Sequence, residues 1–197
     1  MYYKVLKNLR SLYFLCHPWE IGVWYAHPEP RLWHAGYHVT QEPFSYFCPG
    51  ATIYRIDGQV HEFLGNEAVM GRIRLVRGLN DAEYTDVRCP RAGVVVSGGG
   101  HWYAHGDARV SCSNGYVLAH DRSSVHAVGC IVEAFDHAVV DATGGQLYAS
   151  GRSRVHARDG CQCSAFGHAA VCAHPGSTVH VGGEAEALDC GGIIIRA

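Results

Sequence analysis

The second half of the chain repeats one short hydrophobic pattern. From about residue 91 onward, an apolar residue is followed two positions later by Ala or another small residue, and then by a turn former. Eleven such pairs occur: Trp102/Ala104, Val110/Cys112, Val117/Ala119, Val125/Ala127, Val132/Ala134, Val140/Ala142, Leu147/Ala149, Val155/Ala157, Cys163/Ala165, Val171/Ala173 and Val179/Val181. A spacing of two positions places both side chains on one face of an extended strand, which excludes a helix.

The spacing between successive pairs indicates how these strands stack. The steps from one first member to the next alternate between eight and seven positions and then settle at eight. Strands this short cannot form a core alone, whereas stacked coils bury Val on Val and Ala on Ala. With two strands per coil, each eight-residue segment stacks on an eight-residue segment of the next coil, and each seven-residue segment on a seven-residue one. With three strands per coil, eight-residue segments would stack on seven-residue ones. We therefore predict a parallel β-solenoid (β-helix) over positions 91–197, with two strands per coil of about 15–16 residues.

The first ninety residues lack this repeat. Short apolar runs such as YKVL, IGVWYA, ATIYRI and RIRLV are interrupted by prolines, which predicts a separate, small, mixed β domain over residues 1–90. One short helix is expected near residues 64–71 or 80–86. The chain as a whole is thus predicted to be mainly β, with a small N-terminal α+β or β domain before the solenoid.

Composition and charge narrow the class of partner and the compartment. The 197 residues carry a formal net charge of −2, which provides no basic footprint for nucleic acid. No apolar run approaches the roughly 20 residues that span a bilayer, and no export signal is recognisable, so we expect a soluble protein of the host-cell cytoplasm. The nine cysteines are odd in number and scattered, and we interpret them as reduced and mostly buried.

The middle residue of each pair is expected to face outward, in two columns along the solenoid. One column contains Tyr103 and Tyr148, and the other contains His126, Asp141 and His156. Neighbours in a column lie about 4.8 Å apart, so the second column could hold a zinc or nickel ion. The alternative is that these polar residues are simply tolerated on a wet sheet face. No other cofactor is expected.

The segment LWHAGYHVTQEPFSYF, followed by Pro-Gly and the strands IYRI and RIRLVR, resembles an uncharacterised domain of phage and prophage proteins. In that family a Gly-aromatic-His turn precedes a proline and a "kIRlVr" strand, and V-x-A octad repeats often follow. Relatives often have Cys where this chain has Trp33-His34. The resemblance implies a phage or prophage origin and no known activity.

The same turn has a weak likeness to ADP-ribosyltransferases, which hold NAD with a His or Arg, a Gly-aromatic stretch and a Tyr. This likeness implies His38 and Tyr46 as candidates, with Glu62 or Glu67 as the catalytic carboxylate. The alternative is that His38 and Tyr46 only lock a loop. No dinucleotide, P-loop, zinc-protease or serine-hydrolase motif occurs in the chain.

We consider three functions. The leading hypothesis is a non-enzymatic scaffold that presents Trp33, His34, Tyr103 and Tyr148 to a protein partner, for example to inhibit a host defence complex. The others are a nucleotide-binding or ADP-ribosylating enzyme acting through the N-terminal domain, and a virion accessory. The apolar C-terminal strand, with Ile193, Ile194 and Ile195, is expected to cap the solenoid or to join copies of the chain.

Overall fold

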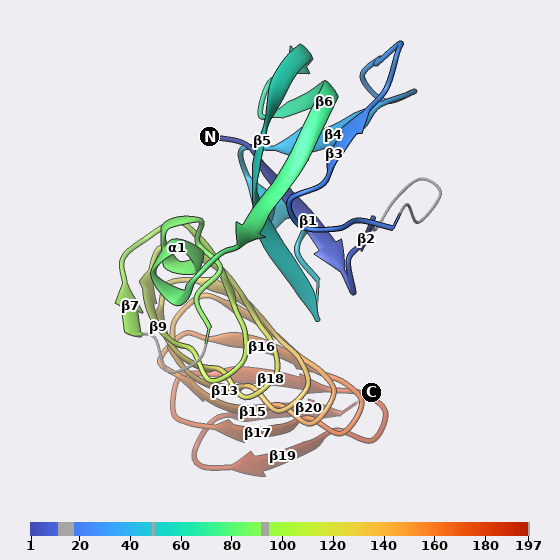
Figure 1. The fold of residues 1–197 in the computed structure, drawn as a ribbon. Helices are drawn as coiled ribbons and strands as arrows, with labels where there is room; N and C mark the ends of the chain where they lie inside the picture. The colour runs from blue at the N-terminus through green and yellow to red at the C-terminus, as the bar shows by residue number, and fades with distance from the viewer. Residues whose placement is uncertain (12–17, 49, 92–94, 197) are drawn as a thin grey trace. The chain divides into compact units, whose positions relative to one another are not determined.

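The protein is described by a computed structural model, which places residues 1–11, 18–48, 50–91 and 95–196. The chain divides into two compact units, Met1–Val87 and Arg88–Ala197, so the boundary lies three residues before the position expected from the sequence. Figure 1 shows the first unit in blue to green and the coils of the second in green to red.

The N-terminal unit is built on a mainly antiparallel sheet. Its described strands are β1 (Tyr3–Lys7), β2 (Arg10–Ser11), β3 (Trp24–Ala26), β4 (Tyr37–Thr40), β5 (Ala51–Leu64) and β6 (Glu67–Gly78). They are ordered β2-β1-β4-β6-β3, and the long strand β5 pairs with both β1 and β6. Ile53, Ile73 and Leu75 are fully buried on this sheet. A single turn of 3-10 helix, Pro43–Tyr46, follows β4.

Helix α1 (Asp81–Asp86) occupies the second of the two helix positions expected from the sequence. Asn80 caps it, because its side chain accepts from the Glu83 N–H while the Glu83 carboxylate accepts from the Asn80 N–H. Tyr84 fixes the helix on the sheet, since its hydroxyl oxygen accepts from the Ile53 N–H at 3.0 Å. Residues 64–71 instead form a turn and the start of β6, so a helix there is wrong. No helix among the described residues has the length and hydrophobicity needed to span a bilayer.

The second unit is a parallel β-solenoid of about six turns, as predicted. Its described strands are β7 (Val95–Ser97), β8 (His101–Ala104), β9 (Arg109–Ser113), β10 (Tyr116–Ala119), β11 (Ser124–Val128), β12 (Ile131–Ala134), β13 (Val139–Thr143), β14 (Gln146–Ala149), β15 (Arg154–Arg158), β16 (Gln162–Ala165), β17 (Ala170–Ala173), β18 (Thr178–Val181), β19 (Glu186–Asp189) and β20 (Ile193–Arg196). Even-numbered strands form one seven-stranded sheet and odd-numbered strands the other, which confirms two strands per coil.

The strand register confirms the coil length deduced from the spacing. Val117 aligns with Val132, whereas Leu147 aligns with Cys163, so the later coil is longer by a single position. The paired Val and Ala side chains are buried, with exposures of 0–5%. Burial of such stacked apolar side chains is the main stabilising contribution in a structure with so thin an interior.

A third inward position lies two residues before many of these pairs. On the odd-numbered sheet it carries small residues that are at most 6% exposed: Ala108, Ser123, Ala138, Ser153, Ala169 and Ala185. Cys130, Cys161 and Ser177 fill it on the other sheet, and the Cys161 thiol lies 3.2 Å from the carbonyl oxygens of Ala142 and Gly144. The interpretation of most cysteines as small buried residues therefore agrees with the structure.

Two cysteines depart from that interpretation. Cys172 and Cys190 form a disulfide between strand β17 and the residue that follows β19, and both side chains are partly exposed. The prediction of a fully reduced set is wrong for this pair. The register partner of Cys172 is Leu188, and a bend after β19 brings Cys190, two residues further on, within bonding distance of Cys172. Cys16 lies outside the described residues.

Strand β20 lies at the edge of its sheet and pairs with β18. Ile194 packs against the core, while Ile193 and Ile195 are 60% and 44% exposed. The C-terminal strand thus covers the last coil with one face and presents the other face to solvent.

Candidate functional site

A cavity of about 520 Å³ lies within the N-terminal unit. Its walls come from β1, β4, the start of β6 and the loop before β4. The lining residues are Tyr3, Lys4, Val5, Ser11, Trp19, His27, Trp33, His34, Ala35, Gly36, Tyr37, His38, Val39, Thr40, Tyr46 and Glu67. Five aromatic rings, three imidazoles, one ammonium and one carboxylate therefore face a common space.

The aromatic wall is braced by ring contacts. The rings of Trp19 and Tyr37 meet edge to face, with centroids 5.3 Å apart, and Tyr25 packs against both. The Trp19 indole N–H donates to the Ser11 hydroxyl at 2.9 Å. Trp19 is 3% exposed, so this part of the wall is formed by a side chain that its neighbours hold in place.

The loop before β4 is shaped by Gly36. Its φ of +94° is left-handed, and a Cβ there would lie 2.8 Å from Val69 and 2.9 Å from Pro30. Arg31 and Ala35 close the loop through two backbone hydrogen bonds of 2.8 and 2.9 Å. This turn directs Trp33, itself at a φ of +64°, towards His38.

Lys4 is the cationic group of the cavity. Its ammonium donates to the His38 carbonyl oxygen at 2.6 Å and lies 5.4 Å from the Trp19 ring centroid. Lys4 as a whole is half-buried, and its ammonium lies in the wall of the cavity, between the His38 carbonyl oxygen and the Trp19 ring. Burial lowers the pKa of Lys4 to about 8, because a charged amine is poorly solvated there.

Two further groups in the cavity have shifted pKa values. Burial lowers the pKa of His38, and the charge of Lys4 lowers it further. The backbone N–H of Trp33 donates to His38 Nε2 at 2.8 Å, so the neutral imidazole carries its proton on Nδ1. Burial raises the pKa of Glu67. The cavity thus disfavours charge on all three groups.

Five residues singled out from the sequence line this cavity: Trp33, His34, His38, Tyr46 and Glu67. Trp33 is 50% exposed at its edge, and its ring stacks on His38 with centroids 6.1 Å apart. Glu62 is exposed and does not line the cavity; its carboxylate accepts from the Leu32 N–H at 2.9 Å. Of the two proposed carboxylates, Glu67 is therefore the one that shares a space with His38 and Tyr46.

Lys4, Trp19 and Tyr37 are parts of the site that no sequence pattern indicated. Lys4 lies in the run YKVL, whose pattern predicts no more than a partly apolar strand. The residue whose carbonyl oxygen accepts from Lys4, His38, is 34 positions away. A lysine between a tyrosine and a valine in a predicted strand was the one available signal. Its burial depends on the sheet order, which local pattern does not give.

The residues singled out on the solenoid have different environments. Tyr148 is 46% exposed, as expected for a surface residue. Tyr103 is 3% exposed, with its ring stacked on His120 at 5.1 Å, so the expectation of an exposed binding residue there is wrong. The stack forms because His120 begins the turn of the next coil, directly beside Tyr103.

The column His126, Asp141 and His156 exists in the predicted register on β11, β13 and β15. Asp141 accepts from the Arg158 guanidinium at 2.8 Å, so its carboxylate already has a partner. Among the described residues, the three potential ligands whose donor atoms lie within 4.8 Å of one another are His156, Cys172 and His174. This group shares His156 with the predicted column but lies one coil further along.

Comparison of the chain with family models, with curated proteins and with solved structures finds no match. The likeness to phage proteins and to ADP-ribosyltransferases therefore stays a prediction, and the function has to be argued from the cavity itself.

Proposed function

We propose that this is a non-enzymatic binding protein whose N-terminal unit holds a small planar aromatic molecule bearing an acidic group. The observation that carries the proposal is the Lys4 ammonium in the wall of an aromatic cavity of about 520 Å³. In this proposal the solenoid is a rigid support.

The size and wall of the cavity suit such a ligand. Pockets for small molecules measure roughly 300–1,000 Å³ and are lined mainly by apolar and aromatic side chains with a few polar groups. Trp19, Tyr37 and Tyr46 offer ring faces and edges to a flat molecule.

Lys4 supplies the selectivity for an acidic group. An ammonium has three N–H donors, and among the described residues the Lys4 ammonium donates to one acceptor, the His38 carbonyl oxygen. An anion that meets the remaining donors in a poorly solvated space interacts more strongly than it would in water.

The arrangement favours binding over ADP-ribosyl transfer. His38 Nε2 already accepts from the Trp33 N–H, and Glu62 is held by Leu32 away from the cavity. Glu62 is therefore not gathered with His38 and Tyr46 around one reacting atom, which catalysis by these groups would require. Glu67 does share the cavity with them, but burial raises its pKa and so disfavours the carboxylate form.

Tryptophan fluorescence tests this proposal, because Trp19 and Trp33 line the cavity. We would titrate the full chain with naphthalene-2-carboxylate, its uncharged carboxamide and naphthylmethylamine. The expected order of affinity is carboxylate, then carboxamide, then the cationic amine. In Lys4→Met, which keeps the length of the side chain, the preference for carboxylate over carboxamide should fall by roughly tenfold.

Lys7→Met is the matched control, since Lys7 lies on the same strand but is exposed and outside the cavity. It should leave the preference unchanged. No binding of any of the three probes would contradict a small-molecule function. Equal binding of carboxylate and carboxamide to the unmodified chain would contradict the role of Lys4.

A protein partner is the second candidate, supported by the edge strand β3. Trp24 on this strand is 40% exposed, and the guanidinium groups of Arg72 and Arg74 lie 4.3 and 4.8 Å from its ring centroid. An edge strand can accept an additional strand from a partner, and here an acidic extended segment would meet Arg72, whereas Arg74 already pairs with Asp57 at 2.7 Å.

A labelled peptide of alternating Asp and Val tests this second candidate. We expect its fluorescence anisotropy to rise with the intact chain and much less with Trp24→Ala. A peptide of alternating Lys and Val is the control, and equal binding of both peptides would contradict this candidate. A phage origin, inhibition of a host defence complex and a cytoplasmic location stay predictions of the sequence.

A further inference from the structure

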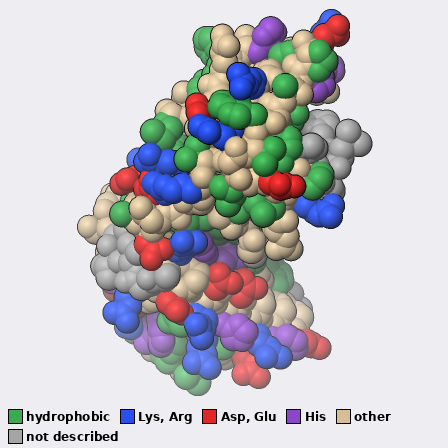
Figure 2. Space-filling model, in the orientation of Figure 1, with side chains coloured by type: hydrophobic (Ala, Val, Ile, Leu, Met, Phe, Trp, Pro, Cys, Tyr) green, Lys and Arg blue, Asp and Glu red, His purple; other side chains and the backbone are tan. Residues whose placement is uncertain are grey.

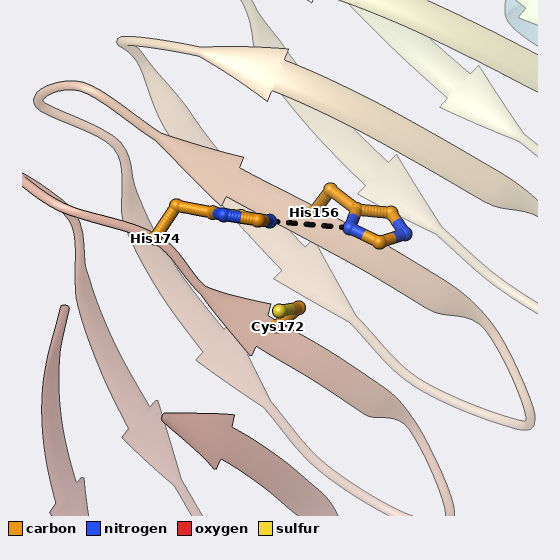
Figure 3. A group of neighbouring side chains, drawn as sticks. All are labelled: His156, Cys172 and His174. Atoms are coloured by element: carbon orange, nitrogen blue, oxygen red, sulfur yellow. Dashed lines mark hydrogen bonds between the residues drawn. The ribbon is translucent and has the colours of Figure 1, made fainter. Parts of the chain in front are cut away.

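Three potential metal ligands gather on the outer face of the solenoid. His156 on β15 is the register partner of Cys172 on β17, and His174 directly follows β17. Figure 3 shows the two imidazoles pointing towards each other, with the Cys172 sulfur on the same side of the sheet. His156 is exposed, and the other two side chains are partly exposed, so an ion could reach them from solvent.

The separation of the two imidazoles suits zinc. Nδ1 of His156 lies 3.3 Å from Nε2 of His174. Two nitrogens at 2.0–2.1 Å from a tetrahedral zinc ion are about 3.3 Å apart, and a sulfur at about 2.3 Å lies about 3.6 Å from each of them. The Cys172 sulfur lies within 4.8 Å of one ring nitrogen of each histidine. Once it is released from its disulfide with Cys190, rotation of the Cys172 side chain towards the imidazoles would complete three corners of a tetrahedron. Two imidazoles and a thiolate are ordinary zinc ligands.

The disulfide between Cys172 and Cys190 decides whether the third ligand exists. A disulfide sulfur carries no thiolate charge, and a metal ion needs the thiolate. We propose that His156, Cys172 and His174 form a zinc site that binds the ion tightly when this disulfide is reduced and weakly when the disulfide is formed. The fourth position falls to water or to the released Cys190 thiolate.

Cleavage of the disulfide is a two-electron reduction. A trialkylphosphine takes up the oxygen of one water molecule and becomes a phosphine oxide, while the disulfide receives two electrons and two protons and becomes two thiols. Zinc then replaces the proton of the Cys172 thiol, and that proton passes to the buffer. In the disulfide state two imidazoles remain, which makes a weaker site.

The competing arrangement is the column His126, Asp141 and His156. Its carboxylate is engaged by Arg158, whereas no ion pair is recorded at His174 among the described residues. The two arrangements share His156, so variants at His126 and His174 separate them.

The test uses the full chain, purified without an affinity tag and stripped of metal. Zinc is titrated in competition with a chromophoric chelator, with and without a trialkylphosphine. We expect the affinity for zinc to rise by at least about tenfold on reduction, since loss of even an outer partner of a metal site costs about that much. Cobalt(II) added to the reduced protein should give the thiolate charge-transfer band and the strong visible bands of a tetrahedral site.

Four variants locate the site. Cys190→Ser leaves Cys172 without its disulfide partner and should bind zinc tightly with or without phosphine. Cys172→Ser and His174→Ala should each lose at least about tenfold in affinity in the reduced state, and Cys172→Ser should also lose the cobalt–thiolate band. His126→Ala, the matched control on the same outer column, should bind as the unmodified chain does.

Three results would overturn the proposal. These are equal zinc affinity of the unmodified chain with and without phosphine, absence of a thiolate band with cobalt, or loss of binding in His126→Ala but not in His174→Ala. The first two need no variant, so they decide the matter even if a substitution disturbs folding.

Discussion

The two units solve the problem of burying apolar surface in opposite ways. The N-terminal unit brings together side chains far apart in the sequence, on antiparallel strands, and encloses a cavity between large aromatic rings. The solenoid brings each residue next to its counterpart one coil further along the chain and fills a thin interior with Val, Ala and Cys. Large, irregularly placed side chains leave space for a ligand inside the N-terminal unit. Small, repeated side chains fill the interior of the solenoid, so that its reactive and ligand-binding groups lie on the outer surface.

The surfaces differ in the same sense. Figure 2 shows hydrophobic side chains in patches on the face of the N-terminal unit that is in view, and Lys or Arg, Asp or Glu and His interspersed on the visible face of the solenoid. We therefore expect ligand binding in the first unit to depend on the shape of the cavity and on the charge of Lys4 in its wall, and ion binding on the second unit to depend on a few exposed side chains.

Breaking the close stacking of the solenoid should have the largest effect. Gly145 has a φ of +88°, and a Cβ there would collide with the Cys130 carbonyl oxygen of the preceding coil. Gly145→Ala should lower the free energy of unfolding by more than about 3 kcal/mol, from the left-handed backbone and the collision together. Urea unfolding followed by circular dichroism measures this.

Gly160→Ala is the matched control. Gly160 also has a left-handed φ, of +80°, but nothing lies within 4 Å of an added Cβ. This variant should cost about 1–2 kcal/mol, from the backbone alone. Equal losses for the two variants would mean that coil-to-coil contact is not what limits substitution at Gly145.

The buried charge in the N-terminal unit should give the next largest effect. The pKa of Lys4 is about 8 in the folded chain, against an ordinary value of 10.5. Between these values the unfolded chain binds more protons, so the free energy of unfolding should rise with pH from about 8 to 10.5. The rise should be about 2 kcal/mol, allowing for contact of Lys4 with water in the cavity.

Lys4→Met should remove this rise, which is measured as the difference between the two proteins in urea unfolding at each pH. Lys7→Met, an exposed change on the same strand, should keep it. A difference between the unmodified chain and Lys4→Met that stays constant with pH would show that the Lys4 ammonium is well solvated.

The second ionisable group of the cavity should have a smaller effect. Glu67 shares the cavity with Lys4, and its carboxylate repels an acidic ligand. Glu67→Gln should therefore strengthen binding of naphthalene-2-carboxylate by about two- to threefold, without changing binding of the carboxamide. Glu62→Gln, outside the cavity, should change neither, and weaker carboxylate binding in Glu67→Gln would place the acidic group elsewhere.

The exposed face of the last coil should matter least for stability and most for association. Ile193 and Ile195 are exposed on the edge strand β20 and could join copies of the chain. Changing both to Lys should alter the free energy of unfolding by less than about 0.5 kcal/mol and shift any associated species to monomer. Sedimentation velocity measures this, and an unchanged associated species would exclude these residues from the contact.

The sequence predicts the solenoid well because its information is local. An i, i+2 pair such as Val125 and Ala127 indicates an extended strand at its own position, and the distance in sequence to the following pairs indicates the length of a coil. The cavity depends on contacts that no local pattern contains, such as that of Lys4 with His38. The Cys172–Cys190 disulfide was missed for a related reason, because the pairing joins a strand residue to a turn residue one coil further on.

The regular register of the outer columns has a consequence for engineering. If the same substitution is made at one outward position of successive coils, identical side chains form a straight row with a spacing of about 4.8 Å. The buried core of the solenoid is not changed. The solenoid is therefore a scaffold on which the number and the spacing of surface groups can be chosen independently.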